Sequence, residues 1–184
     1  INWARSLGLF NDFAEINTFG PSSAIAQNLA FVPALTGLAC PHWDRSATGM
    51  WIGLSLDTTP LMMVQAIIEG IAFRAAEVLA AMNDHAPLGG AISIDGGMTA
   101  NPYFCQFLAN VLDRDVAVPQ LRELTALGTA MLASRDLEAR EDRESLATVS
   151  QKPDVFHPVQ DLGAYRQKFD EAIRRSKDWQ EKSM

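Results

Sequence analysis

The stretch ISIDGGMTANPYF, residues 92–104, carries a short apolar run that stops at an acid and two glycines. Residues 91–95 have the composition of a strand, and a helix is predicted over residues 101–112. Because Gly96 and Gly97 lack a Cβ, the backbone N–H groups between the strand and the helix can lie close to a ligand. A tight turn that requires a positive φ explains the same pair of glycines equally well. The local pattern therefore leaves both interpretations open.

The elements predicted on either side of this stretch alternate between strands and helices. Thr59 is the expected N-cap, and Pro60 the first residue, of a long apolar helix that runs to about Met82. Further strands are predicted at residues 29–35, 50–56 and 115–119, and further helices at residues 1–8, 125–134 and 161–179, the last capped by Asp161. This order predicts an α/β fold, with a mixed sheet that has a parallel section and is flanked by helices.

The composition is that of an acidic globular domain. The chain has 184 residues, 48% of them hydrophobic, and a formal net charge of -7, which argues against binding to nucleic acid or anionic lipid. Cys40 and Cys105 have no C-x-x-C spacing, so neither a zinc site nor a disulfide framework is predicted, and a reducing cytoplasm is expected. Charged residues interrupt the apolar stretch 61–82, which argues against a membrane span. The helix at residues 1–8 lacks an N-cap before it, so we expect the chain to be the C-terminal part of a longer protein.

Two common phosphate-binding motifs, G-x-G-x-x-G and the P-loop, are absent from the sequence. Other segments occur in a distinctive order: FVPALTGLACPHWD at residues 31–44, SIDGGMTANPYFCQFLANVLDRDVAVP at residues 93–119, ELTALGTAMLA at residues 123–133 and FHPVQDLGAYRQKFDEAI at residues 156–173. Together they resemble the C-terminal domain of the FGGY carbohydrate kinases, and glycerol kinases most closely. The resemblance covers nearly all of residues 1–184. It implies the actin-like, or ribonuclease-H-like, ATPase fold, in which two domains close on ATP and substrate.

The resemblance implies that this domain supplies the adenine and ribose side of a nucleotide site. Matched position by position, Gly97 and Asn101 resemble nucleotide-contacting residues, and Gly96 allows the same close approach. An ordinary cap of its helix is the competing interpretation of Asn101. Asn2 stands where glycerol kinases have a glutamine that lines the adenine pocket. Because asparagine is one methylene shorter, a polar residue on a helix surface is the alternative there.

No catalytic residue and no metal ligand is predicted in this chain. In the family that it resembles, the catalytic base is an aspartate of the N-terminal domain, which also holds the substrate and much of the phosphate. The resemblance implies a kinase that uses ATP and Mg²⁺ to phosphorylate a primary hydroxyl of glycerol or a related polyol, and it implies that this chain alone is inactive. The alternatives are a kinase for a pentulose or tetritol, and a non-catalytic nucleotide-binding module. Association into a homo-oligomer stays open.

A glycine-containing loop at residues 36–49 is long enough to suggest function. Trp43 is expected to pack this loop down and Asp44 to accept hydrogen bonds from its amides, rather than to act as a catalytic pair. His42 and Arg45 depart from the usual glycerol kinase pattern, which leaves the substrate subclass open. The three histidines are scattered along the sequence and are expected to be structural or on the surface.

The remaining polar candidates are also given structural roles. Glu69, Arg74 and Glu77 of the long helix are expected at an interface or on an exposed strip. Asp95 is expected to support the glycine turn or a metal–water network, rather than to remove a substrate proton. The small side chains of the helix at residues 125–134 are expected to pack against the sheet.

Overall fold

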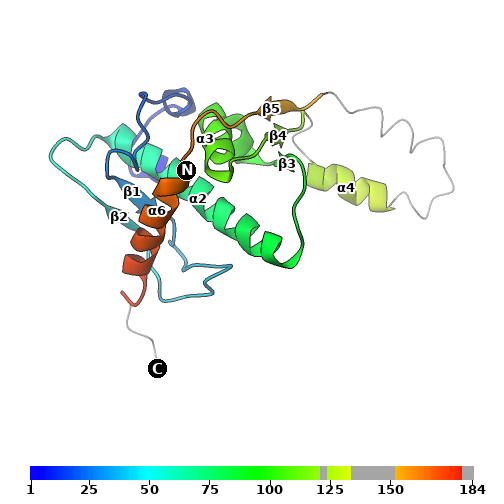
Figure 1. Ribbon diagram of the computed structural model, residues 1–184. Helices are drawn as coiled ribbons and strands as arrows, with labels where there is room; N and C mark the ends of the chain where they lie inside the picture. The colour runs from blue at the N-terminus through cyan, green and yellow to red at the C-terminus, as the bar shows by residue number, and fades with distance from the viewer. Residues whose placement is uncertain (121–123, 134–151, 180–184) are drawn as a thin grey trace.

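The computed structural model describes residues 1–120, 124–133 and 152–179. Its elements in chain order are α1 (Asn2–Ser6), η1 (Phe13–Ile16), β1 (Ala30–Val32), β2 (Met50–Ile52), α2 (Pro60–His85), β3 (Ile92–Ser93), η2 (Gly97–Ala100), α3 (Pro102–Leu112), β4 (Val116–Val118), α4 (Leu124–Ala133), β5 (Asp154–Phe156) and α6 (Gly163–Ser176). Figure 1 shows α2 crossing the molecule, with β1, β2 and α6 toward one end and α3 and the remaining strands toward the other.

The described strands form two separate sheets. β3, β4 and β5 make a mixed sheet in that order, in which β3 is parallel and β5 antiparallel to β4. β1 and β2 form an antiparallel pair that places Phe31 opposite Trp51. The predicted α/β class and the mixed sheet with a parallel section are confirmed. β5 was not predicted, because its strand conformation depends on pairing with β4, which lies far away in the sequence.

Helix α2 is the central element of the core. The Thr59 hydroxyl accepts a hydrogen bond from the Met62 N–H at 3.2 Å, which confirms the predicted cap. Gly70 lies where α2 crosses β1, and a Cβ at this position would collide with the carbonyl oxygen of Phe31. The absence of a side chain at Gly70 therefore lets the helix rest directly on the strand backbone.

Phe73 joins three helices in the core. Its ring stacks on Phe169 of α6, with centroids 4.8 Å apart, and meets Phe107 of α3 edge to face at 5.5 Å. All three side chains are buried. Truncating Phe73 to alanine removes contacts to both neighbouring helices, and such a change in a core typically costs about 3–5 kcal/mol.

Two local predictions need correction. Asp161 is not the N-cap of α6: that position is Leu162, and the Asp161 carboxylate accepts a hydrogen bond from the N–H of Gly163 at 2.7 Å, one residue into the helix. The packing predicted for the small residues of α4 is not found at Ala126 and Ala130, which are exposed, and the helix stands beyond the sheet in Figure 1. The charged segment at residues 135–144 lies outside the described residues. None of the described helices combines the length and apolar character that a membrane crossing requires.

Candidate functional site

A hollow of about 650 Å³ opens where α1, η1, η2 and the start of α3 meet. It is lined by Ile1, Asn2, Phe13, Ile16, Asn17, Gly97, Met98, Ala100 and Asn101. This volume falls within the range of small-molecule sites, roughly 300–1,000 Å³. Three of the four predicted site residues, Asn2, Gly97 and Asn101, thus come together from distant parts of the sequence. Gly96 adjoins them in the chain but does not line the hollow.

The two glycines have different roles. Gly96 has φ +94°, a conformation that favours glycine, and its carbonyl accepts hydrogen bonds from the Thr99 N–H at 3.0 Å and the Thr99 hydroxyl at 2.8 Å. Gly97 has no such conformation, and a Cβ built on it would meet no protein atom within 4 Å. Each interpretation of the glycine pair therefore applies to one residue. The turn requires a glycine at Gly96, whereas Gly97 leaves open space at the edge of the hollow.

Asn101 fixes the wall of the hollow. Its Oδ1 accepts a hydrogen bond from the Phe104 N–H at 2.9 Å, which caps α3, and its Nδ2 donates to the carbonyl of Ile16 at 2.8 Å. The side chain is 8% exposed. Both ends of the amide are therefore engaged within the protein, so Asn101 holds η1 against the start of α3.

Asn2 and Asp95 offer polar groups that the protein does not engage. Asn2 is exposed at the first turn of α1, and its amide makes no hydrogen bond with any described residue. The exposed Asp95 carboxylate likewise has no hydrogen bond or ion pair within the described part of the chain. The expectation that Asp95 supports the glycine turn is wrong, because Thr99 makes the hydrogen bonds that hold that turn.

The opposite wall of the hollow is built by η1, which the sequence interpretation did not include. The Asp12 carboxylate accepts from the Ala14 N–H at 2.8 Å, and the Glu15 carboxylate accepts from the Asp12 N–H at 2.8 Å, which together form a capping box. Phe13 is 43% exposed, and the Arg5 guanidinium lies 5.3 Å from the centre of its ring. The D-x-x-E spacing at residues 12–15 was the sequence signal for this turn.

A buried carboxylate of α2 is hydrogen-bonded to the start of α3 and to the segment at residues 24–25. Glu69 is 2% exposed and accepts hydrogen bonds from the N–H groups of Ala24 at 2.7 Å and Ile25 at 3.0 Å. The Tyr103 hydroxyl donates to the same carboxylate at 2.5 Å and accepts from the Gln65 amide at 2.8 Å. Burial raises the pKa of Glu69 to about 7, although these hydrogen bonds act in the opposite direction. The interface or exposed strip expected for Glu69 is wrong, because α2 needs this residue to satisfy the backbone of the segment that covers it.

Arg74 and Glu77 are not on an exposed strip either. Arg74 donates to the Cys40 carbonyl at 2.7 Å and pairs with Glu77, whose carboxylate lies 3.0 Å from His42 Nε2. These contacts tie the loop at residues 36–49 to α2. His42 is therefore structural, as predicted.

The end of the same loop agrees with the sequence in part. The Asp44 carboxylate accepts from the Ser46 hydroxyl at 2.6 Å and the Ser46 N–H at 2.8 Å, so its predicted role is confirmed, and these bonds lower its pKa. Trp43 was expected to pack the loop down, but it is 76% exposed with φ +50°. That expectation is wrong, and the loop is anchored by Arg74 and His42 instead.

Residues 4–137 match the C-terminal domain of the FGGY family of carbohydrate kinases. The glycerol kinase of Trichlorobacter lovleyi is 35% identical over 185 residues, which cover 97% of this chain and 37% of that protein. The glycerol kinase of Nitrosomonas eutropha is 36% identical over 164 residues, which cover 86% of this chain and 32% of that protein.

Solved structures give the same result. The Plasmodium falciparum glycerol kinase with ADP has a TM-score of 0.76 and 26% identity, and the match covers 95% of this chain and 36% of that one. A xylulose kinase from Lactobacillus acidophilus has a TM-score of 0.70 at 24% identity, covering 95% of this chain and 36% of that one, which shows the fold alone.

The fold is therefore that of the actin-like ATPases, as the sequence predicted. The chain belongs to the FGGY family of carbohydrate kinases. It spans about a third of the length of the curated relatives that it matches.

Proposed function

We propose that this chain forms the adenine-nucleotide side of an ATP-dependent carbohydrate kinase, as the FGGY C-terminal domain of a longer protein. The observation that carries the proposal is the convergence of Asn2, Gly97 and Asn101 on one hollow. Gly97 allows a ligand to approach the backbone closely, because it has no side chain and no protein atom lies within 4 Å of the position a Cβ would occupy. The family membership and the structural similarity to a glycerol kinase with ADP support the same assignment.

The lining of the hollow suits a nucleoside. Phe13, Ile16 and Met98 provide apolar surface for a planar base, and the unengaged amide of Asn2 provides a donor and an acceptor at the rim. Asn101 acts as a positioning residue, because its amide holds the two walls together. On this basis the chain binds the nucleotide and fixes the direction of its phosphates.

Magnesium enters the proposal with the phosphates. The described residues contain no group of three or more His, Cys, Asp or Glu side chains that could hold a metal ion. The Asp95 carboxylate, next to the glycine turn and unengaged by the described protein, is suited to hold a water molecule of a nucleotide-bound ion. The ion would neutralise charge on the transferring phosphoryl group.

We propose glycerol or a related polyol as the phosphoryl acceptor, in a cytoplasmic enzyme. The support is the similarity to several glycerol kinases at 30–36% identity. The catalytic base and most of the polyol site are proposed to lie in an additional N-terminal domain, so residues 1–184 alone are expected to be inactive. Kinase activity of the whole protein on glycerol, but not on xylulose or erythritol, would support this substrate. Preference for a pentulose or tetritol would instead assign another member of the family, and nucleotide binding without any transfer would favour a regulatory module.

Nucleotide binding is tested by calorimetry of this chain with ADP. Gly97→Val places a branched side chain at the edge of the hollow, and we expect it to weaken ADP binding at least about tenfold, the effect of losing roughly 1.4 kcal/mol. Gly89→Val is the matched control, because Gly89 also has no positive φ and has open space around its Cβ position, but does not line the hollow. Equal ADP affinity of the two variants would remove the hollow as the nucleotide site.

A further inference from the structure

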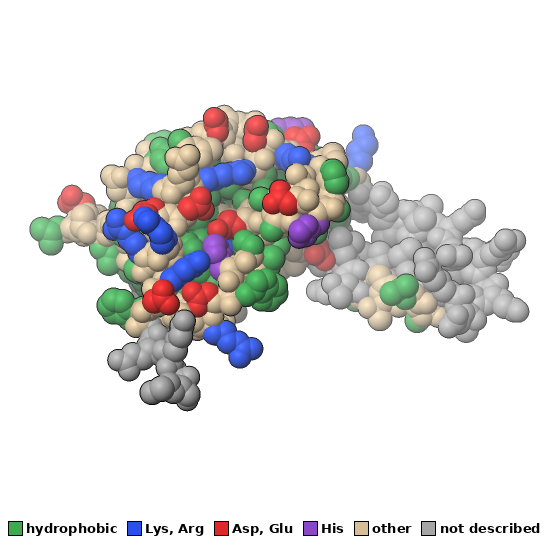
Figure 2. Space-filling view, turned by 60° about the horizontal axis from the view of Figure 1, so that its bottom comes forward, with side chains coloured by type: hydrophobic (Ala, Val, Ile, Leu, Met, Phe, Trp, Pro, Cys, Tyr) green, Lys and Arg blue, Asp and Glu red, His purple; other side chains and the backbone are tan. Residues whose placement is uncertain are grey.

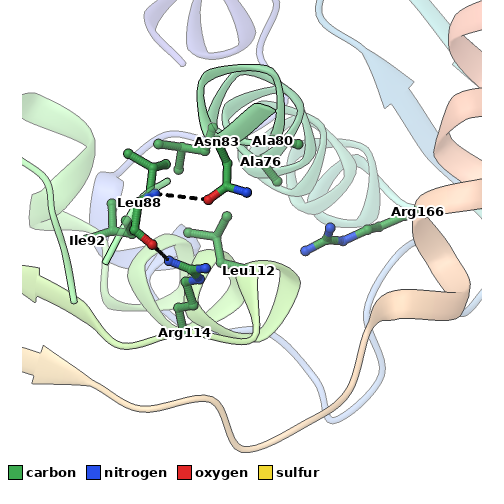
Figure 3. A pocket seen from close by; sticks show the side chains of 9 residues that line it. Ala76, Ala80, Asn83, Leu88, Ile92, Leu112, Arg114 and Arg166 are labelled. Carbon is green, nitrogen blue, oxygen red and sulfur yellow. Dashed lines mark hydrogen bonds between the residues drawn. The ribbon is translucent and has the colours of Figure 1, made fainter. Parts of the chain in front are cut away.

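A second hollow, of about 200 Å³, lies away from the nucleotide site and shares no lining residue with it. It is enclosed by the C-terminal half of α2, the segment at residues 88–92, the end of α3, and α6 (Figure 3). Six of its nine lining residues are apolar, and the largest of these are Leu79, Leu88, Ile92 and Leu112. Its remaining polar groups come from Asn83 and from two arginines.

The two guanidinium groups reach this hollow from different elements. Arg114 follows α3, where the left-handed conformation of Asp113 turns the chain, and its Nη1 donates to the Leu88 carbonyl at 2.6 Å. Arg166 projects from α6 and donates to the Val111 carbonyl. Figure 3 shows Arg114 directed toward Leu88 and Arg166 directed from α6 toward Leu112. Each arginine thus keeps further N–H groups beyond the one bond that holds it in place.

Neither guanidinium group forms an ion pair with a described residue, although the charge of Arg166 acts on the nearby Asp170. Within the described ranges, no carboxylate lies within 4 Å of Arg114 or Arg166, whereas Arg174 and Arg175 pair with Glu171. Figure 2 shows the same mixing of acidic and basic side chains over one face of the molecule. Two guanidinium groups without an ion pair thus meet at one hollow, in a chain with a formal net charge of -7.

The Arg166 Nε gives an independent indication of a missing acceptor. It is buried and has no hydrogen-bond partner, and it is the one such side-chain nitrogen or oxygen among the described residues. A buried N–H without an acceptor costs about 1–3 kcal/mol. Glu77 and Asp170 line a neighbouring hollow with Arg166, but neither forms an ion pair with it.

We propose that this second hollow binds a small organic carboxylate. The anionic group would accept hydrogen bonds from Arg114 and Arg166, which suit a planar carboxylate. The hydrocarbon part would cover the leucine and isoleucine wall, which a bare inorganic anion would leave in contact with water. The volume corresponds to about seven water molecules at liquid density, so the ligand is limited to a short branched or linear chain. A bound carboxylate would link α6 to the 88–92 segment and to α3.

Isovalerate is a suitable probe, and its binding can be followed by ¹⁵N–¹H NMR titration of the protein. We expect saturable shifts at the amides of residues 88–92 and 112–114, and no saturable shifts with isovaleramide, which has the same shape without the charge. Arg114→Gln and Arg166→Gln should each weaken isovalerate binding about tenfold, because each substitution removes a positive charge and the charge-assisted hydrogen bond that it makes to the carboxylate. Arg174→Gln on the same helix is the matched control and should leave the affinity unchanged.

Several results would overturn the proposal. Equal binding of isovalerate and isovaleramide by the unsubstituted protein would remove the role of the two arginines, and this comparison does not depend on any variant folding. Tighter binding of inorganic phosphate than of isovalerate would assign the hollow to phosphate instead. Shifts that remain linear in isovalerate concentration would show that no site exists.

Discussion

Replacing Glu69 by glutamine tests how α2 holds the segment at residues 22–25 and the start of α3 together. Glu69 is almost fully buried, and burial raises its pKa from 4.5 to about 7. An acid with a higher pKa in the folded than in the unfolded state binds its proton more tightly when folded. Its contribution to stability is therefore fully present below pH 4.5 and is lost as the pH rises through about 7.

The size of the effect follows from the two pKa values. At about 1.4 kcal/mol per pKa unit, the rise corresponds to about 3 kcal/mol of unfolding free energy, of which about 2 kcal/mol is lost between pH 5.5 and pH 8.5. Glutamine does not titrate, so this pH dependence disappears in the variant. Glutamine also places an NH₂ group where one carboxylate oxygen accepts a hydrogen bond from Ala24 or Ile25. The backbone N–H that loses its acceptor is buried, which lowers the unfolding free energy by about 1–3 kcal/mol.

Urea unfolding, followed by circular dichroism at pH 5.5 and pH 8.5, measures both effects. We expect Glu69→Gln to be less stable than the unsubstituted protein at pH 5.5, and the difference to narrow by about 2 kcal/mol at pH 8.5. Taking the difference between the two proteins cancels the contributions of all other titrating groups, Asp170 among them. Tyr103→Phe is a companion variant that removes a hydrogen bond to the carboxylate, so it should steepen the pH dependence. Parallel pH profiles of the unsubstituted protein and Glu69→Gln would refute the reasoning.

Three other substitutions test the packing of the core and the walls of the proposed nucleotide hollow. Asn101→Asp keeps the oxygen that caps α3 but loses the donor to Ile16, so ADP affinity should fall more than in the cap-preserving control Thr59→Ser; equal ADP affinities would contradict this. Gly70→Ala should destabilise the protein by about 1–3 kcal/mol in urea unfolding, because its Cβ meets the β1 backbone, and a neutral result would disprove that close approach. Phe73→Ala should cost about 3–5 kcal/mol by the same measurement, and a loss below about 1 kcal/mol would contradict its central packing.

The parts of the fold that the sequence predicted depend on local signals. Thr59 and Pro60 mark the start of α2 by cap chemistry that involves only neighbouring residues, and the helix begins there. Residues 101–112 likewise combine a cap with an apolar helical pattern, which α3 confirms. β5 has no such signal, because its strand conformation depends on pairing with β4 across a long stretch of sequence.

The sequence predicted the parts of the candidate site that depend on local backbone conformation. It did not predict the parts that depend on contacts between residues far apart in the chain. The turn at Gly96 and Gly97 could be recognised from two adjacent glycines. The bond from Asn101 to Ile16 joins residues 85 positions apart, and no sequence pattern marks it. Glu69 was misassigned for the same reason: its partners Ala24 and Ile25 lie 45 and 44 positions earlier, so helical spacing alone suggested an exposed strip.

These distant hydrogen bonds determine the shape of the hollow that we propose as the nucleotide site. The start of α3 is held from one side by Asn101, which bonds to η1, and from the other by Tyr103, which bonds to Glu69 on α2. Glu69 also holds the N–H groups of Ala24 and Ile25, so one buried carboxylate joins α2, α3 and the segment at residues 22–25. Buried polar groups whose hydrogen bonds are all satisfied specify a single arrangement. Loss of the bond from Asn101 to Ile16, or of the bond from Tyr103 to Glu69, should therefore loosen the start of α3. The geometry of the hollow therefore depends as much on these hydrogen bonds as on Gly97 at its edge.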